Sequence, residues 1–214
     1  MSSKSPGRWL VAAGLVAIVI GIVFAPFLLG LAGEHSIASG NYAGAVDLAT
    51  LAIRLRPNVG FPYGVRADAH MQMGNLDQAL QDINRAISLN PEEPLFYGLR
   101  GNLYRAMGES EAALADYTTS IELDPTNIDA WINRGRESAV LGRYTEGIDD
   151  LTSAIALDAE CADAYLSRGI LWKVLAQDSR ARADLGEAIR LYDAQGLPEQ
   201  ADKARQVLDD MGDG

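Results

Sequence analysis

The residue types that most often carry enzyme chemistry are few in this 214-residue chain. Its two histidines, His35 and His70, lie far apart and lack the short spacing of metal ligands. Its one cysteine is Cys161, and we expect the nearby Asp158 and Asp163 to raise the pKa of its thiol and to reduce its reactivity. The glycines form no phosphate-binding loop. These observations predict a protein that is not an enzyme and that uses no cofactor and no metal ion.

Arginine and aspartate recur in a fixed relation. The arginines are Arg66, Arg100, Arg134 and Arg168, and the aspartates are Asp82, Asp116, Asp150 and Asp184. Each aspartate follows its arginine by 16 residues, a spacing that brings the two to one level of an antiparallel helix pair. The arginines could instead bind anions, but each has a candidate carboxylate partner. We therefore predict structural ion pairs, and we call these eight residues the ion-pair ladder.

These residues must be positioned by a repeated element, because other residues recur with the same period of 34. Glycine recurs at Gly40, Gly74, Gly108 and Gly142, and isoleucine at Ile53, Ile87, Ile121, Ile155 and Ile189. Leucine recurs at Leu55, Leu89, Leu123, Leu157 and Leu191, and proline at Pro57, Pro91 and Pro125. A period of this length indicates a solenoid, a repeat protein in which each unit stacks on the next.

The segment "YGLRGNLYRAMGESEAALADYTTSIELDP" resembles a tetratricopeptide repeat (TPR). The matching residues are Tyr97, Gly101, Tyr104, Gly108, Ala113, Tyr117 and Pro125. The following copy departs from the pattern with Ser138 at a usual aromatic, Gly147 at a usual alanine and Ala159 at the usual proline. The resemblance implies an all-α fold, a right-handed α-solenoid of about five helix pairs. The solenoid would cover residues 26–195, with repeats at about 26–59, 60–93, 94–127, 128–161 and 162–195.

The two ends of the chain have different compositions. Residues 9–32 contain no charged residue, and a helix of this length would span roughly 36 Å, enough to cross a membrane. We predict a transmembrane anchor at 9–32 that merges with the first repeat at Pro26. A cleaved signal peptide is the alternative, although the apolar run is longer than a usual signal core. At the other end, residues 196–214 are expected to form a capping helix and a frayed tail.

The distribution of charge predicts the orientation and limits the partners. Lys4 and Arg8 precede the apolar segment, so residues 1–8 are expected to form a cytoplasmic tail, with the repeats across the membrane, periplasmic or otherwise extracytoplasmic. After Gly33 the chain has 16 basic and 29 acidic residues, a net charge of −13, which argues against binding of nucleic acid.

The predicted transmembrane segment has a small residue at every fourth position. This spacing suggests self-association or packing on a partner helix, although small residues are common in membrane helices. The residues at this spacing are Ala13, Ala17, Gly21 and Ala25.

The resemblance also implies a concave, partner-binding groove formed by the first helix of each repeat. The groove positions of the family correspond to Phe61, Asp68, Met71, Leu95, Asn102, Arg105, Asp129, Ile132, Asn133, Arg136, Asp163, Leu166, Ser167, Ile170 and Lys173. Among them, Arg105, Arg136 and Lys173 would form a basic spot for an acidic or C-terminal carboxylate segment, or would be ordinary solvated charges. Of the residues with which some family members clamp a chaperone C-terminus, only Asn102 and Asn133 match, so that activity is not expected.

The sequence thus predicts a non-catalytic, membrane-anchored TPR adaptor or scaffold that binds other proteins. Two alternatives stay open. One is a signal-cleaved, soluble periplasmic or secreted binding protein, and the other is a structural subunit of a larger membrane complex.

Overall fold

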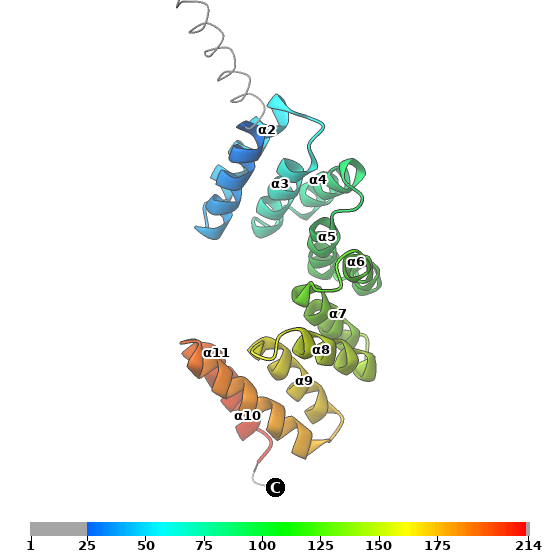
Figure 1. Ribbon diagram of the computed structural model, residues 1–214, viewed down its shortest axis with the longest axis vertical. Coiled ribbons are helices and arrows are strands. Elements are labelled where there is room, and N and C mark those ends of the chain that lie inside the picture. The colour runs from blue at the N-terminus through cyan, green and yellow to red at the C-terminus, as the bar shows by residue number, and fades with distance from the viewer. Residues whose placement is uncertain (1–24, 213–214) are drawn as a thin grey trace, which may run out of the picture. The chain divides into compact units, whose positions relative to one another are not determined.

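The computed structural model describes residues 25–212, in which every regular element is an α-helix (Figure 1). A helix covers residues 25–38. It is followed by α2 (Tyr42–Leu55), α3 (Gly60–Gln72), α4 (Leu76–Leu89), α5 (Pro94–Met107), α6 (Ser110–Leu123), α7 (Ile128–Val140), α8 (Tyr144–Leu157), α9 (Ala162–Val174), α10 (Asp178–Ala194) and α11 (Pro198–Asp209). The helices form two compact units, unit 1 up to Glu92 and unit 2 from Glu93 onward.

Unit 1 contains two helix pairs, the first made by residues 25–38 with α2 and the second by α3 with α4. The first helix expected from the repeat pattern, at residues 26–39, is therefore present at 25–38. Its glycines allow close contact with α3, because a Cβ atom at Gly30 would lie 2.5 Å from the ring of Phe61. A Cβ atom at Gly33 would lie 2.8 Å from Val65. Pro26 is fully buried, so this helix is an integral part of the unit.

The transmembrane prediction falls largely outside the described residues. Residues 1–24 hold the expected tail, most of the expected anchor and three of the four small packing residues, Ala13, Ala17 and Gly21. Within residues 25–212, no helix combines the length and the apolar character needed to cross a membrane.

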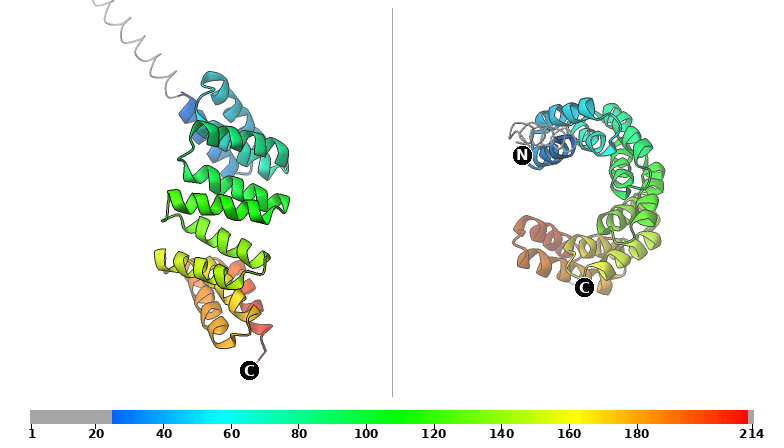
Figure 2. Two further views of the ribbon diagram at one scale, coloured as in Figure 1. Left: turned by 90° about the vertical axis from the view of Figure 1, so that its right-hand side faces the viewer. Right: turned by 45° about the horizontal axis from the view of Figure 1, so that its top comes forward.

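Unit 2 contains three further helix pairs, α5–α6, α7–α8 and α9–α10, followed by α11 (Figures 1 and 2). The first helices of successive pairs also contact one another, α5 with α7 and α7 with α9. We call the side of unit 2 formed by these first helices the inner face, and the side formed by α6, α8 and α10 the outer face. The helix α11 covers the last pair, where Ala201 and Ala204 pack in one buried cluster with Leu191 and Tyr192.

The turn inside each pair requires a left-handed backbone conformation. Gly108 ends α5 with φ of 79°, a value that glycine adopts without the steric penalty of a side chain. Gly40, Gly74 and Gly142 have the same conformation in their pairs. In the last pair Ala176 takes this place with φ of 54°, so one repeat carries backbone strain that the others avoid.

Candidate functional site

The ion-pair ladder is present in all four helix pairs that have the two residues. Each arginine donates through Nε and Nη2 to both carboxylate oxygens of the aspartate 16 residues later, at 2.7 to 2.9 Å. The four aspartates are only 5–8% exposed. A buried carboxylate with a bidentate guanidinium partner fixes the relative height of the two helices, so the arginines serve packing.

The ladder has a third member that the pattern of charged residues did not reveal. The Nη1 atoms of Arg66, Arg134 and Arg168 each donate to a threonine hydroxyl 16 residues earlier, at 3.0 to 3.2 Å. The threonines are Thr50, Thr118 and Thr152, on the second helix of the preceding pair. Their positions follow the 34-residue period, with Asn84 in the fourth place, so the period itself is the signal that could have identified them.

The expected groove residues of unit 1 lie on α3. Phe61, Asp68 and Met71 are all half-buried. Phe61 packs against the helix at residues 25–38, where its ring centroid lies 6.0 Å from that of Phe27. Asp68 accepts a hydrogen bond from Gln72, one turn further along the same helix. Phe61 thus has a packing role in addition to any contact with a partner.

In unit 2, four of the expected groove residues come together in one open pocket of about 190 Å³ on the inner face. Leu95 and Asn102 come from α5, and Asp129 and Asn133 from α7. Leu95 is 65% exposed. Gly98 also lines the pocket.

Two polar residues of this pocket were not expected from the sequence. The hydroxyl of Tyr117 donates to Asn102 Oδ1 at 2.8 Å, and Asn133 Nδ2 approaches the same oxygen at 3.4 Å. Asn127 also lines the pocket and caps α7 by accepting from the backbone N–H of Ala130. Burial raises the pKa of Tyr117, while the nearby charge of Arg105 opposes that shift. The pocket is therefore lined by hydrogen-bonding groups of fixed orientation and by one exposed leucine.

Two other expected groove residues are in the wrong environment for partner contact. Ile132 is only 5% exposed and belongs to a core cluster with Ile148 and Leu151. Ser167 is 8% exposed, and its hydroxyl donates to the backbone oxygen of Asp163. Both face the interior because helix packing turns these positions of α7 and α9 toward the neighbouring helices.

The expected basic spot is not a cluster of free cations. Arg136 forms an ion pair with Asp163 at 3.2 Å, and its Nε donates to Ser167 at 2.8 Å. Lys173 donates to the backbone oxygen of Val207 in α11 at 3.2 Å. Arg105 lies beside Tyr117, so each of the three cations already has a protein contact.

The remaining inner-face residues lie on α9. Ile170 is 37% exposed, and Leu166 is half-buried against the cluster at Tyr192. The hydroxyl of Tyr192 donates to Asp163 at 2.9 Å, and burial together with this bond raises the pKa of Tyr192. Asp163 thus joins Arg136 on α7 to Tyr192 on α10, which gives it a structural role.

The residues with potential catalytic chemistry are dispersed. Burial raises the pKa of the Cys161 thiol, and the negative charges of Asp163 and Asp158 add to that shift. His35 is exposed on the helix at residues 25–38, and His70 lies near the end of α3. Within residues 25–212, no group of three or more histidine, cysteine or acidic side chains is placed to hold a metal ion.

The repeats match known families at two places. Residues 62–93 match the family described as "Tetratricopeptide repeat", and residues 101–136 match the family described as "TPR repeat". No curated protein shows significant sequence similarity to the chain.

Solved structures with the same fold extend these matches. The structure described as a functional characterization of Pseudomonas aeruginosa pilF has a TM-score of 0.75 at 14% identity and covers 90% of this chain and 94% of its own. MamA has a TM-score of 0.68 at 18% identity, with 77% and 96% covered. YrrB, described as a TPR protein with an unusual peptide-binding site, has a TM-score of 0.62 at 17% identity, with 80% and 88% covered. The fold is that of a TPR protein, a class whose members bind other proteins.

Proposed function

We propose that this protein is a non-catalytic, membrane-anchored adaptor that binds an extended segment of a partner protein on the inner face of unit 2. The observation that carries this proposal is the open pocket formed by Leu95, Asn102, Asp129 and Asn133. Its residues come from two different helix pairs, so a bound segment would cross from α5 to α7. YrrB, which has a similar fold, is described as having a peptide-binding site, and this supports binding of a peptide segment here.

The pocket suits a segment with exposed backbone groups and one apolar side chain. An amide group such as that of Asn133 can both donate to and accept from a peptide backbone. The exposed Leu95 offers an apolar surface at the edge of the pocket. Because the three nearby cations have protein contacts, the segment need not be acidic, unlike the ligand expected from the sequence.

Affinity purification from gently solubilised membranes tests the pocket. The test variant carries Leu95→Glu and Asn133→Ala, and the control carries Val140→Glu and Gln206→Ala. Val140 is also highly exposed, at 71%, and lies at the end of α7 away from the pocket. We expect a partner that is recovered with the wild type and the control and is lost with the folded test variant. Equal recovery with all three proteins would overturn the pocket assignment.

The membrane anchor is proposed from the uncharged residues 9–32 and from the apolar surface at the end of that segment. Phe27, Leu28 and Leu31 are 53%, 60% and 41% exposed on the helix at residues 25–38. The opposite side of that helix is buried through Pro26 and the two glycines. The exposed apolar side would lie at the membrane surface, with the repeats held close to the bilayer.

The uncleaved anchor is favoured over a signal peptide because cleavage near Gly33 would remove half of a packed helix. The segment lost would include Pro26, which is fully buried, and Gly30, which lies against Phe61 of α3. Mass spectrometry of the mature protein tests this. We expect the mass of a chain that starts at Met1 or Ser2. The mass of a chain that starts near Gly33 would contradict the uncleaved anchor.

The proposed orientation places the amino terminus in the cytoplasm and the repeats on the opposite side of the membrane. A cysteine at the exposed position Glu199, in a Cys161→Ser background, serves as the probe. We expect a membrane-impermeant maleimide to label Glu199→Cys in intact cells. Labelling only after lysis would show that the repeats lie in the cytoplasm and would contradict the proposed orientation.

A further inference from the structure

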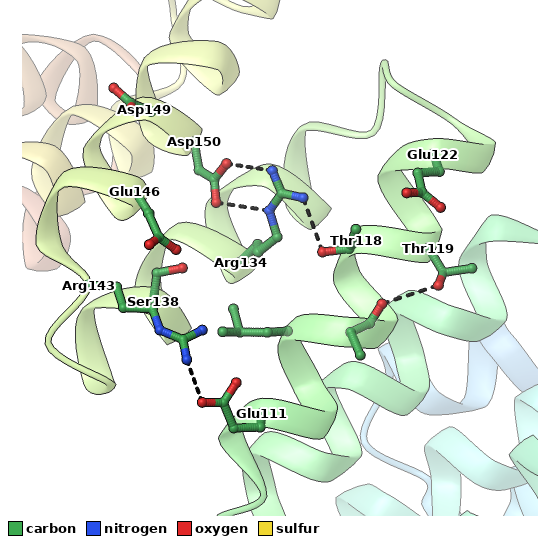
Figure 3. A pocket seen from close by; sticks show the side chains of 12 residues that line it. Glu111, Thr118, Thr119, Glu122, Arg134, Ser138, Arg143, Glu146, Asp149 and Asp150 are labelled. Atoms are coloured by element: carbon green, nitrogen blue, oxygen red, sulfur yellow. Dashed lines mark hydrogen bonds and ion pairs between the residues drawn. The ribbon is translucent and has the colours of Figure 1, made fainter.

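The outer face of unit 2 has a second and larger pocket, of about 710 Å³, between α6, α7 and α8 (Figure 3). It lies on the other side of the helix pairs from Leu95 and Asn133, with which it shares no lining residue. Its volume is within the range of small-ligand sites, roughly 300 to 1,000 Å³.

The pocket coincides with a departure from the repeat pattern. Ser138 occupies the place that holds His70, Tyr104 and Trp172 in three other copies, while the first copy has Ser36 there. In the preceding copy, the Tyr104 ring lies 5.8 Å from the guanidinium carbon of Arg100. With serine in place of a ring, the space beside Arg134 is open and forms part of the pocket.

Ser138 itself indicates that the pocket accommodates a polar group. The residue is 2% exposed and lines the pocket. Among the described residues, no side-chain hydrogen bond of its hydroxyl is present. Its oxygen is not among the fully buried side-chain atoms that lack a partner, so it is accessible from the pocket and open to a bound donor or acceptor.

The charges that line the pocket favour a cation. Five carboxylates face two arginines, and both arginines are paired, Arg143 with Glu111 at 2.6 Å and Arg134 with Asp150. The other three carboxylates are those of Glu122, Glu146 and Asp149. Within the part of the chain that the structure describes, these three form no ion pair and accept no hydrogen bond. Figure 3 shows Glu146 and Asp149 on α8 and Glu122 on α6.

We propose that this pocket binds a lysine or arginine side chain from a basic segment of a partner protein. The three unpaired carboxylates, which lie at separate places around the pocket in Figure 3, would attract the cationic group, and its N–H groups would donate to one of them or to the Ser138 hydroxyl. The apolar stem of such a side chain would pack on Leu114 and Ala115, which also line the pocket. The adaptor would then have two binding surfaces, one on each face of unit 2, with different chemical preferences.

The test uses the full chain in detergent and a fluorescein-labelled hexalysine peptide, with binding followed by fluorescence anisotropy. One variant, Ser138→Tyr, fills the pocket with the ring found in other copies and leaves every charge in place. A second variant, Glu122→Gln with Glu146→Gln and Asp149→Asn, removes the three unpaired charges. The matched control removes three exposed carboxylates elsewhere in unit 2, with Asp178→Asn, Glu199→Gln and Asp209→Asn.

We expect the affinity to fall roughly tenfold or more in both pocket variants and less than threefold in the control, since single exposed ion pairs contribute little. The inner-face variant with Leu95→Glu and Asn133→Ala should bind the peptide as the wild type does, which separates this inference from the proposed function. Equal losses in the pocket and control triple variants would mean general attraction to an acidic protein and would overturn the site. Undiminished binding by a folded Ser138→Tyr variant would overturn it as well.

Discussion

At the scale of single residues, Ala176 has a conformation that its side chain disfavours. Its φ of 54° is in the left-handed region, where the equivalent positions Gly40, Gly74, Gly108 and Gly142 hold glycine. A left-handed conformation costs an L-residue roughly 1–2 kcal/mol. The fold imposes this cost at one position, because the other contacts of α9 and α10 fix the turn.

We therefore predict that Ala176→Gly stabilises the protein. The expected gain is about 0.5–1 kcal/mol, because the relief of strain exceeds the added flexibility of the unfolded chain. Urea denaturation followed by circular dichroism measures the change. The control is Gly142→Ala, where a Cβ atom would meet no other atom within 4 Å, so that a loss of about 1 kcal/mol would reflect backbone strain alone. An unchanged or lower stability of Ala176→Gly would show that the turn is not strained.

The Cys161 thiol provides a prediction about pH. Its pKa is raised above the ordinary value of 9.0, first by burial and then by the negative charges of Asp163 and Asp158. Because only the thiolate reacts, alkylation by iodoacetamide at pH 7 should be slower than for an exposed cysteine, and the rate should still be rising at about pH 9. The comparison is Gln206→Cys in a Cys161→Ser background. Equal rates at pH 7, or a plateau below pH 9, would contradict the prediction.

At the scale of helices, α7 and α8 are packed more closely than a side chain would allow. A Cβ atom at Gly147 would lie 2.6 Å from the backbone oxygen of Gly135, and one at Gly135 would lie 2.9 Å from the backbone oxygen of Gly147. The TPR pattern has alanine where Gly147 stands. Glycine therefore replaces the usual alanine at this position because the two helix backbones lie too close together to leave room for a methyl group.

We predict that Gly147→Ala destabilises unit 2, although alanine is the better helix former and restores the repeat pattern. The new methyl group would force apart two backbones, which outweighs a propensity gain of about 1 kcal/mol. The matched control is Gly186→Ala in α10, where a Cβ atom would meet nothing within 4 Å and the propensity gain should appear in full. Thermal denaturation of both variants measures the two effects, and we expect a lower Tm for Gly147→Ala and a higher Tm for Gly186→Ala. An increase in Tm for Gly147→Ala would show that the two helices can move apart without a loss of stability.

At the scale of the whole chain, successive helix pairs of unit 2 pack on one another, α6 on α7 and α8 on α9. The helix α11 covers the α9–α10 pair. Tyr192 and Leu191 are 2% and 3% exposed beneath it, while the outward residues of α11, such as Lys203 and Gln206, are exposed. A polar outer surface on the last helix is what a repeat array needs for solubility.

We predict that a chain ending at Gly196 is destabilised and aggregates. Two large side chains would be exposed, at about 1.5–3 kcal/mol for each if the exposure were complete. Size-exclusion chromatography and thermal denaturation measure the effect. The control is Lys203→Ala with Gln206→Ala, which leaves the buried side of α11 intact and should change stability by less than about 0.5 kcal/mol. A truncated chain as stable as the control would mean that α11 is dispensable.

The helix pairs could be predicted from the sequence because a period of 34 residues identifies the same packing position in every copy. The ion pairs between the arginines and aspartates of the ladder could be predicted for the same reason. The groove was predicted less well, since its positions were transferred one by one without their neighbours. Ile132 fits the family position but packs in the core, and Arg136 is paired with Asp163, a contact that follows no period.

The outer pocket shows a different limit of sequence analysis. The repeat pattern identified Ser138 as a small residue at a position that usually holds an aromatic side chain. The space that the aromatic ring would occupy can, however, be filled by neighbouring side chains or left open. Only the arrangement of α6, α7 and α8 distinguishes these outcomes. The charge of the pocket likewise depends on which carboxylates have partners, and composition alone does not reveal this.

The third contact of the ladder has an evolutionary consequence. Because Arg66, Arg134 and Arg168 each bond to a threonine of the preceding pair as well as to their own aspartate, every joint between such copies uses the same chemistry. A gene that gained or lost one whole 34-residue copy would encode a new junction whose bonding groups already match. Length can therefore change by recombination between copies without a compensating mutation, whereas an insertion of any other length would separate arginine, aspartate and threonine.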